Sequence, residues 1–473
     1  MHLDHAQCYR AICAKDTRFD GVFFTGVKTT GIYCRPVCSA KVPKSENVVF
    51  YPSAAAAHQG GFRPCLRCRP ETAPNSPAWV GTSAVVTRGL RLIEEGALDG
   101  GDVTSLANRL GVGERHLRRL FLQHVGATPI AVAQARRILL AKQLIHETQL
   151  PMSDVALAAG FGSIRRFNEV FQSLFGRPPI ELRRQASALP STVNGADVTV
   201  KLRFRPPYDW AGARTFLSER LYQGVEAFIG DVYCRSFYIN GHEGLVFVGP
   251  GGSDYLLVRV RCAHLAVLPK VIAHVRRCFD LDADPATIGA HLSEDPLLRP
   301  LVARRPGLRV LQSWSLLEGV VRTILGQQVT VRAAISLGQR FLANYAIPIG
   351  PDLTNEGMVT HRFPEYSDLA GIDLAFMPMP KSRGSCLSDA LARLSAMVAS
   401  NALSTENILH SLETVPGIGP WTLDYLALRV LRDPDALPVT DVAIKRAFKL
   451  QNQAIGVSLP LDAYGKRWPP WRA

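Results

Sequence analysis

The sequence predicts a multidomain protein that is mainly α-helical with α+β parts, and three observations lead to this fold class. The chain has 473 residues, too many for one ordinary hydrophobic core, so about three or four domains are expected. Two segments rich in proline, serine and small residues, 71–79 and 185–196, have the composition of linkers. Between them apolar residues recur with a helical period, whereas segments after residue 196 alternate apolar and polar residues like half-buried strands.

These changes of pattern divide the chain into four predicted domains. Residues 1–76 form a small cysteine-containing module, and residues 82–186 form an all-helical module. Residues 196–300 combine strands with helices, and residues 301–473 are again helical. No tandem repeat is evident, so the four domains are expected to have four different folds.

The charge of the chain indicates a polyanionic partner. The formal net charge is +14 and the isoelectric point is about 9.5, which suits nucleic acid or an anionic membrane surface. No run of about 20 apolar residues is present, and the N-terminus has no signal-peptide pattern, so we expect no membrane association and a cytoplasmic location. The alternative is that the charge only keeps the protein soluble.

Four of the ten cysteines lie in two close pairs. Cys34 and Cys38 are separated by three residues, and Cys65 and Cys68 by two. Two close pairs on separate turns can supply four thiolates to a tetrahedral zinc ion. Without a secretion signal, a metal site is favoured over the alternative of a disulfide. The remaining cysteines are scattered singly among apolar neighbours and are expected to be small buried side chains.

The N-terminal segment resembles a known family. The stretches VKTTGIYCRPVC, ENVVFY and GGFRPCLRCRPE are similar to the N-terminal domain of Ada-type methyl-responsive regulators. The resemblance implies that Cys34 irreversibly accepts a methyl group from a DNA methyl phosphotriester, and that Cys34, Cys38, Cys65 and Cys68 bind Zn²⁺. Zinc keeps its thiolate ligands deprotonated, and the thiolate is the nucleophilic form of cysteine. Basic residues around the pairs suit a position close to phosphate: Lys28, Arg35, Lys41, Arg63, Arg67 and Arg69.

Methylation of one ligand would change the charge of such a site. A zinc ion with four thiolates carries two net negative charges, and methylation of one sulfur to a thioether leaves one. Repulsion from DNA phosphates then falls, so the methylated protein is expected to bind DNA more tightly. A single covalent step would thereby convert repair into a signal.

Residues 84–184 contain two helix-turn-helix patterns, with Gly111 and Gly160 at their turns. The second helix of each pattern presents residues that suit a DNA major groove. These residues are Arg115, His116, Arg118 and Arg119 in the first pattern, and Ser163, Arg165, Arg166 and Asn168 in the second. The tandem, which ends in FGRPPIELRR, resembles the AraC-type DNA-binding domain, so double-stranded promoter DNA and RNA polymerase are the expected partners. For any one arginine, the alternative is a solvated helix face.

The segment LETVPGIGPWTLDYLALRV predicts a helix–hairpin–helix. Pro416, Gly417 and Gly419 would let the backbone approach a DNA phosphate, and N–H groups at the following helix start favour an anion. A Gly/Pro hairpin also occurs as a simple turn. Asp441 lies downstream and opens the predicted helix VAIKRAF. It could be the N-cap of that helix, or a carboxylate that faces a flipped nucleotide.

This spacing resembles the helix–hairpin–helix superfamily of base-excision glycosylases, and residues 196–471 are similar to 3-methyladenine DNA glycosylase II of the AlkA type. The stretches RPPYDW, RPGLRV, VRTILGQQVTV, PGIGPWT and KRWPPWR carry the similarity. It implies that Asp441 stabilises the sugar cation as the glycosidic bond breaks, or helps a water to attack. It also implies that Trp421 and Tyr425 line a pocket for an electron-poor alkylated purine, and that Gln328 fills the gap left by the flipped base.

Two features bear on the activity of this half. Lyase members of the superfamily carry a lysine where this chain has Trp421, so we expect a monofunctional glycosylase. In the family a last helix follows PWR and completes the base pocket, whereas this chain ends at Ala473, so the glycosylase domain is expected to be truncated at its C-terminus.

The first hypothesis is therefore a transcriptional regulator and DNA repair enzyme in one chain, a monomer associated with the nucleoid. The alternative is a methylation-responsive activator with an inactive glycosylase half. A thiol or metal sensor is a third hypothesis.

Overall fold

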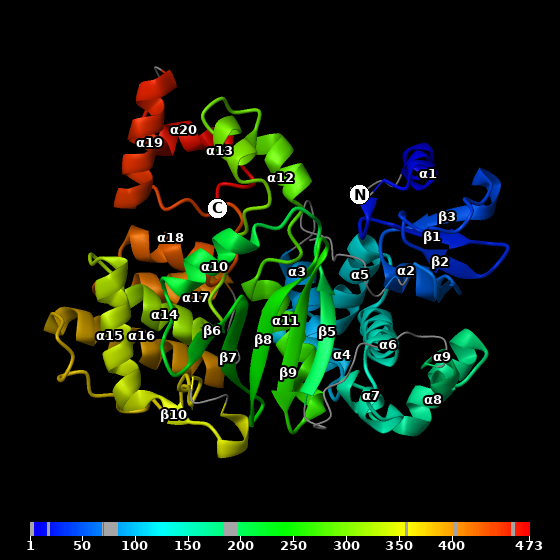
Figure 1. Cartoon of the computed structure of the whole chain (residues 1–473), viewed down its shortest axis with the longest axis horizontal. Coiled ribbons are helices and arrows are strands. Elements are labelled where there is room, and N and C mark those ends of the chain that lie inside the picture. The colour runs from blue at the N-terminus through cyan, green and yellow to red at the C-terminus, as the bar shows by residue number, and fades with distance from the viewer. Residues whose placement is uncertain are drawn as a thin grey trace.

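The structure is a computed structural model that describes residues 4–16, 19–68, 70, 84–183, 197–354, 358–400, 405–455 and 459–473. Figure 1 shows helical layers at both sides of a central antiparallel sheet, with a second, smaller sheet near the N-terminus. The predicted fold class, multidomain and mainly α-helical with α+β parts, is confirmed. Both predicted linkers, 71–79 and 185–196, lie outside the described residues.

The N-terminal module is a small sheet with strand order β3-β1-β2-β4. Strands β1, β2 and β3 pair antiparallel, whereas β2 and the short β4 pair parallel. Phe23 and Tyr33 are fully buried in this module. Its elements are α1 (His5–Ala14), β1 (Phe24–Val27), β2 (Ile32–Cys34), η2 (Ser45–Asn47), β3 (Val48–Tyr51), α2 (Ala54–Gln59) and β4 (Arg63–Pro64).

Helices α3 to α9 form the second module, as the helical periodicity predicts. Gly111 and Gly160 have φ values of +69° and +86°, a left-handed conformation that favours glycine at the turn between paired helices. Phe121 and Phe167 are fully buried on the inner faces of α5 and α8. The helices are α3 (Ala84–Glu94), α4 (Val103–Arg109), α5 (Glu114–Val125), α6 (Pro129–Glu147), α7 (Met152–Ala158), α8 (Ile164–Phe175) and α9 (Pro179–Arg183).

The third module is an antiparallel sheet with strand order β5-β9-β8-β7-β6. The sequence predicts a strand that ends at the glycines of GLVFVGPGG, but β8 continues through them to Gly252, with an irregular register between Pro250 and Gly252. The elements are β5 (Asp197–Arg203), α10 (Trp210–Ser218), β6 (Glu226–Ile229), β7 (Val232–Ile239), β8 (His242–Gly252), β9 (Tyr255–Cys262), η4 (Leu265–Val267) and α11 (Leu268–Cys278).

The C-terminal part is helical as predicted, except that a short two-stranded sheet of β10 and β11 interrupts it. The end of α12 and the turn that follows it pack against α19 and α20 through a cluster that includes Leu297, Phe448 and Trp468. The elements are α12 (Pro285–Leu292), α13 (Arg299–Arg304), α14 (Leu316–Leu325), α15 (Val331–Tyr345), β10 (Ile347–Pro348), η5 (Pro351–Leu353), β11 (His361–Arg362), α16 (Lys381–Ala399), α17 (Thr405–Glu413), α18 (Pro420–Arg429), α19 (Val442–Ile455), α20 (Leu461–Tyr464) and η6 (Gly465–Arg467).

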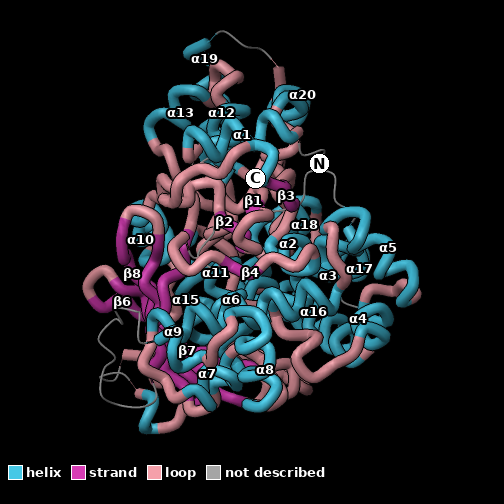
Figure 2. Tube along the Cα trace, turned by 90° about the vertical axis from the view of Figure 1, so that its right-hand side faces the viewer, coloured by secondary structure: helices cyan, strands magenta, loops and turns pink. Residues whose placement is uncertain are grey.

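The second and third modules share one hydrophobic core. Buried side chains of α6 to α9, such as Leu144 and Phe171, belong to the same cluster as Val200 and Val258 of the sheet. Figure 2 shows the N-terminal sheet above α2, α2 above α6, and α7 and α8 below, an order that Figure 1 repeats. Helix α6 therefore lies at the junction of three modules.

Within the described residues, the helices include none with the length and hydropathy needed to cross a membrane. The predicted domain boundary at 300/301 falls inside α13. The four-domain division stays a prediction.

Candidate functional site

The four paired cysteines meet at one end of two neighbouring strands. Cys34 is the last residue of β2 and Cys65 directly follows β4. Because β2 and β4 run parallel, with Tyr33 opposite Pro64, both cysteine pairs lie at the same end. The four Sγ atoms lie within 4.8 Å of one another, and Zn–S bonds of about 2.3 Å place tetrahedral sulfur ligands about 3.8 Å apart. All ten cysteines are free thiols, so the disulfide alternative is wrong and the site fits one zinc ion.

The thiol chemistry supports a bound cation. Hydrogen bonding with Cys38, and then with Cys65 and Cys68, raises the pKa of Cys34. Hydrogen bonding with Cys34, and then with Cys38 and Cys68, lowers the pKa of Cys65. Four thiolates at this separation would repel one another without a cation. A divalent cation offsets that repulsion and holds all four as thiolates.

Arg35 was expected close to phosphate, but its side chain points into the protein. Its side chain is 12% exposed and forms an ion pair with Asp20. Its Nη1 donates to the backbone oxygen of Cys68 at 3.3 Å, and its backbone N–H donates to Cys68 Sγ at 3.4 Å. Arg35 therefore belongs to the structure that surrounds the cysteines. Lys41 and Arg67 are exposed, and Arg69 lies outside the described residues.

The structure places the predicted DNA-binding arginines on the exposed faces of α5 and α8. These are Arg115, Arg118, Arg119, Arg165 and Arg166. Arg118 Nη2 lies 2.5 Å from Glu114 Oε1, and Arg165 Nε lies 2.8 Å from Glu169 Oε1. Such exposed pairs along one helix are weak, so DNA phosphates can replace the carboxylates. Ser163 instead caps α8, because its Oγ accepts from the Arg166 N–H at 3.1 Å.

The predicted helix–hairpin–helix is formed by α17 and α18. Pro416 and Gly417 are exposed at the tip of the hairpin, while Ile418 anchors it in the core. Gly417 has a φ of +94°, which a side chain would strain. Gly419 occupies the N-cap position of α18 with a φ of −105°. At this helix start Pro420 carries no N–H, and the Thr422 N–H donates to Gly419 O at 3.0 Å.

Asp441 and the two aromatic residues lie together, as the resemblance implies. Oδ1 of Asp441 accepts from the N–H groups of Ala443 and Ile444 at 2.9 and 3.0 Å, so Asp441 caps α19. Its Oδ2 accepts from Trp421 Nε1 at 2.8 Å. The rings of Trp421 and Tyr425 stack with centroids 5.2 Å apart. The N-cap alternative is thus confirmed, and it does not exclude the other one, because capping holds the carboxylate beside the aromatic pair.

Gln328 lies on an exposed turn before α15 and has a φ of +54°. Its neighbour Gln327, which sequence reasoning missed, ties this turn to the hairpin. Gln327 Nε2 donates to Gly417 O at 2.9 Å and to Thr422 Oγ1 at 3.0 Å. Arg383 Nη2 donates to the backbone oxygen of Gln327 at 2.7 Å. The two adjacent glutamines in GQQV were the sequence feature that could have indicated a role for Gln327.

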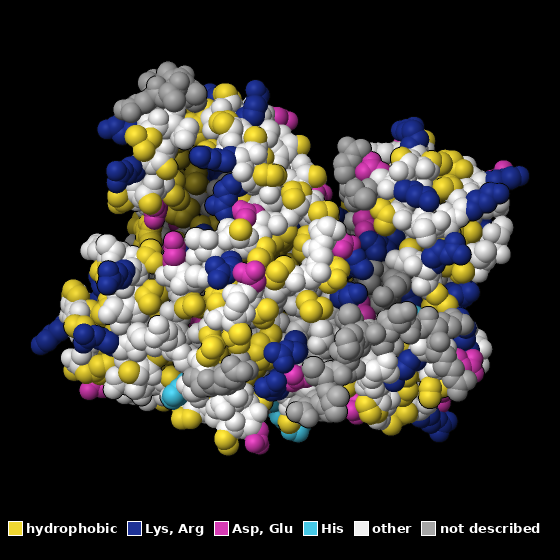
Figure 3. All heavy atoms as spheres, viewed as in Figure 1, with side chains coloured by type: hydrophobic (Ala, Val, Ile, Leu, Met, Phe, Trp, Pro, Cys, Tyr) yellow, Lys and Arg dark blue, Asp and Glu magenta, His cyan; other side chains and the backbone are white. Residues whose placement is uncertain are grey.

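A hollow separates α19 from α18 on the face shown in Figure 3. Apolar side chains cover its base, and Lys and Arg side chains stand along its rim. Trp421 and Tyr425 on α18 and Asp441 at the start of α19 come from the elements that border it. The arrangement suits an apolar ring inside and phosphates at the edge.

Lys142 of α6 was also missed by sequence reasoning. It is fully buried, and its Nζ donates to the backbone oxygen of Cys65 at 2.9 Å. Its position four residues after Ile138, on the buried face of α6, was the signal for an inward-facing lysine.

Comparisons with known proteins agree with this arrangement. The family model for the metal binding domain of Ada matches residues 7–71, that for a helix-turn-helix domain matches residues 106–185, and that for the AlkA N-terminal domain matches residues 199–315. A Mycobacterium tuberculosis protein described as "Probable bifunctional transcriptional activator/DNA repair enzyme AlkA" is 38% identical over 482 residues, which cover 100% of this chain and 95% of that protein. This chain belongs to the AlkA family of bifunctional transcriptional activators and DNA repair enzymes.

Two further similarities cover the halves of this AlkA-family chain. DNA-3-methyladenine glycosylase 2 of Escherichia coli is 30% identical over 58% of the chain and 93% of its own length. The bifunctional transcriptional activator/DNA repair enzyme AdaA of Bacillus subtilis is 32% identical over 40% of the chain and 86% of its own length. The predicted combination of repair and regulation, and zinc as cofactor, are confirmed.

The solved 3-methyladenine DNA glycosylase of Archaeoglobus fulgidus shares the fold of the C-terminal half. Its TM-score is 0.50 at 15% identity, over 57% of this chain and 94% of that one.

Proposed function

We propose that this chain removes methyl groups from DNA phosphotriesters with Cys34, activates promoters in response, and excises alkylated purines with Asp441. The observation that carries the proposal is the presence of two separate reactive centres in one chain. One is the cluster of four thiols within 4.8 Å, and the other is the Asp441 carboxylate held 2.8 Å from Trp421 Nε1.

At the first centre the Cys34 sulfur attacks the methyl carbon of a DNA methyl phosphotriester. An S–C bond forms, the C–O bond breaks, and the electron pair stays on the phosphate oxygen, which restores a normal phosphodiester. Cys34, Cys38, Cys65 and Cys68 would hold zinc, which supplies the positive charge that keeps these sulfurs deprotonated and nucleophilic. The thioether formed is stable, so each protein molecule reacts once.

The reacted protein is then the activator. One negative charge is lost beside the DNA, so affinity for phosphates rises. Helices α5 and α8 present Arg115, Arg118, Arg119, Arg165 and Arg166 to the DNA grooves. A monomer on double-stranded promoter DNA, in contact with RNA polymerase and located in the cytoplasm with the nucleoid, completes the proposal.

At the second centre a flipped alkylated purine stacks on Trp421 and Tyr425, while Gln328 occupies its place in the duplex. The bond between C1′ and the base nitrogen breaks, and its electron pair leaves with the base. The fixed negative charge of Asp441 stabilises the sugar cation until a water oxygen bonds to C1′ and gives up one proton to the surrounding water. Because Trp421 stands where lyase relatives carry lysine, no covalent amine intermediate forms and the enzyme is monofunctional.

Base release from methylated DNA tests the glycosylase half. Asp441→Asn keeps the N-cap but removes the charge, so the rate of 3-methyladenine release should fall at least about 100-fold. Asp462→Asn, at an exposed position of α20, is the matched control and should keep the wild-type rate. Equal release by Asp441→Asn and wild type, or no release by either, would favour the alternative of an activator with an inactive glycosylase half.

Mass spectrometry after incubation with methyl phosphotriester DNA tests the zinc module. One methyl group should appear on the peptide that contains Cys34, with a parallel rise in promoter affinity. Transfer to another cysteine would refute the assignment of Cys34. A protein whose DNA affinity responds to oxidant or metal but ignores methylated DNA would instead be a thiol or metal sensor.

A further inference from the structure

Adjacent residues of α6 form hydrogen bonds with two different parts of the chain. One part is the zinc module (residues 4–70), and the other is the repair half (residues 197–473). Lys142, fully buried, donates from Nζ to Cys65 O at 2.9 Å. The next residue, Gln143, donates from Nε2 to Lys201 O of β5 at 2.9 Å. One turn later, Glu147 Oε2 accepts from the Lys201 N–H at 2.8 Å. Lys142, which contacts the backbone of Cys65, is therefore next to Gln143 and close to Glu147, and these two residues bind the backbone of β5.

These contacts close an edge of the central sheet. β5 is an outer strand, since the order is β5-β9-β8-β7-β6, and among the described residues no further strand pairs with its outward N–H and C=O groups. Gln143 and Glu147 are 7% and 4% exposed, so they satisfy the Lys201 backbone in a dry environment. Buried polar networks of this kind stabilise the fold strongly only when every donor and acceptor in them keeps its hydrogen-bond partner.

A second connection runs from the zinc site through the N-terminal module. Arg35 contacts Cys68 O and the Asp20 carboxylate. The backbone oxygen of Asp20 accepts from Arg205 Nη2 at 2.7 Å, and Arg205, just beyond β5, is 4% exposed. Lys142 and Arg35 thus contact the backbone oxygens of two of the cysteines, and Arg205 connects to Arg35 through Asp20.

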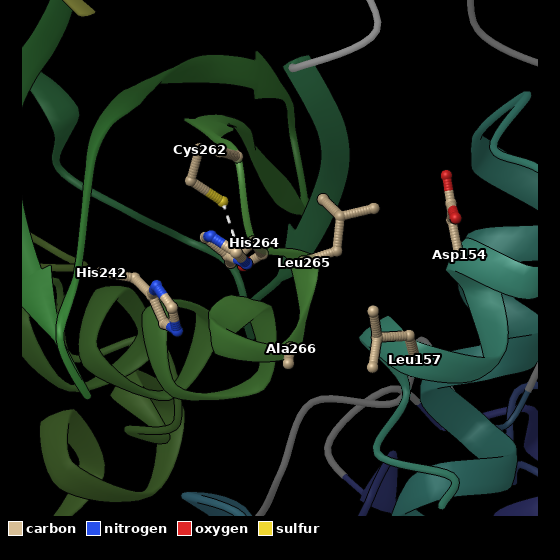
Figure 4. Close-up of a pocket in the computed structure, with 8 residues that line it drawn as sticks. Asp154, Leu157, His242, Cys262, His264, Leu265 and Ala266 are labelled. Atoms are coloured by element: carbon tan, nitrogen blue, oxygen red, sulfur yellow. Dashed lines mark hydrogen bonds between the residues drawn. The ribbon is translucent and has the colours of Figure 1, made fainter. Parts of the chain in front are cut away.

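Apolar contacts join the modules beside the cysteines. Leu66, between two of the cysteines, packs against the core shared by α6 to α9 and the sheet. A crevice of about 320 Å³ lies elsewhere between α7 and the sheet module. Figure 4 shows Asp154 and Leu157 of α7 on one side of it and His242 and His264 on the other.

We propose that the contacts around the zinc site hold the two regulatory modules (residues 4–183) against the repair half, an arrangement that we call the latch. We propose further that methylation of Cys34 weakens these contacts. The inference rests on the proposed methyl transfer to Cys34. The transfer takes one of two net negative charges from the cluster, so the attraction of Lys142 and Arg35 toward it weakens. The repair half is therefore bound more tightly to the regulatory modules before Cys34 is methylated than afterwards.

Hydrogen exchange at the Lys201 amide reports the latch, because this N–H donates to Glu147. The full-length zinc-bound protein is methylated with phosphotriester DNA, freed of DNA, and compared with unmethylated protein. Lys201 exchange should be at least about fivefold faster after methylation, which is a modest coupling between two sites. Amides in the centre of the sheet, on β7 and β8, should exchange at the same rate in both samples.

Lys142→Met tests the latch without methyl transfer. The variant removes a cation but no zinc ligand, and Lys201 exchange in its unmethylated form should be fast. Gln339→Met is the matched control, because Gln339 also bridges to a backbone, that of Gln223, at 2.8 Å but lies far from α6 in sequence and module. Its Lys201 exchange should equal that of wild type.

The outcomes separate the two proposals. Absence of a methyl group on Cys34 refutes the proposed methyl transfer, and the latch is then decided by Lys142→Met alone. A methyl group on Cys34 with unchanged Lys201 exchange refutes the latch and leaves the methyl transfer intact. Slow Lys201 exchange in zinc-bound Lys142→Met also overturns the latch.

Discussion

Gln327 and Gln328 are adjacent in the sequence but have different environments. Gln328 is exposed in a left-handed conformation, whereas Gln327 bonds to the hairpin at Gly417 and to α18 at Thr422. One residue therefore couples the turn that carries Gln328, the hairpin at Gly417, and helix α18. In the proposed function, such coupling positions Gln328 when the base flips.

Gln327→Met should lower the kcat/KM of base release by about tenfold, because it removes hydrogen bonds that together contribute about 1–2 kcal/mol. Methionine keeps the volume, so the thermal unfolding midpoint should stay close to that of wild type. The measurement is base release from methylated DNA together with fluorescence of a flipped-base analogue. Gln339→Met is again the control, and a Gln327→Met enzyme that flips the base normally would contradict the positioning role.

At the scale of elements, the hairpin between α17 and α18 contains two glycines with different requirements. At Gly417 the φ is +94° and an added Cβ would lie 3.3 Å from Cys386. At Gly419 the φ is −105°, and an added Cβ would meet nothing within 4 Å. The first glycine is needed to form the hairpin, whereas space at the second is available to a partner from outside the protein.

The two alanine variants should therefore separate folding from binding. Gly417→Ala should cost about 1–3 kcal/mol of unfolding free energy through backbone strain. Gly419→Ala should unfold like wild type but bind abasic-site DNA more weakly, because its methyl group occupies the space where a phosphate approaches. Thermal unfolding and DNA titration give the two readouts. Wild-type DNA affinity in Gly419→Ala would show that the phosphate does not approach there.

At the scale of the whole molecule, a buried ionic network joins the central sheet to the glycosylase helices. Glu318 of α14 is 2% exposed, and its oxygens lie 2.8 Å from Arg235 Nη2 of β7 and 2.8 Å from Arg322 Nε. Arg322 also pairs with Glu226 of β6. Burial alone would raise the pKa of Glu318, but the two arginines outweigh it and lower the pKa to about 2.

The lowered pKa predicts how acid affects the C-terminal half. The network contributes its full stability above the ordinary glutamate pKa of about 4.5 and loses it as the pH falls toward about 2. Glu318→Gln should cost about 3–5 kcal/mol at neutral pH, because it leaves two buried arginines short of a counter-charge, and should flatten this acid dependence. Urea unfolding between pH 7 and pH 3 measures both, with Glu413→Gln, at a position whose side chain is 67% exposed, as the control. An unchanged acid dependence in Glu318→Gln would contradict the prediction.

Much of the fold was predictable because its signals are local. The spacing of the cysteines, the apolar period of α3 to α9 and the glycines of the hairpin depend on residues close together in the chain. Cys34, Cys38, Cys65 and Cys68 meet as expected, and Asp441 lies against Trp421. The roles of these residues and those of the arginines on α5 and α8 remain predictions for the experiments above.

The sequence by itself determined the kinds of module and the four cysteines that meet in one cluster, and it predicted where the glycosylase site lies. Only the tertiary structure decided how the modules are joined. Arg35 forms an ion pair with Asp20, Lys142 donates to the backbone oxygen of Cys65, and Glu147 accepts from the backbone N–H of Lys201 in β5. These contacts join residues that are 15 to 77 positions apart. Their partners are set by which buried surfaces pack together, and no local period or motif records that choice.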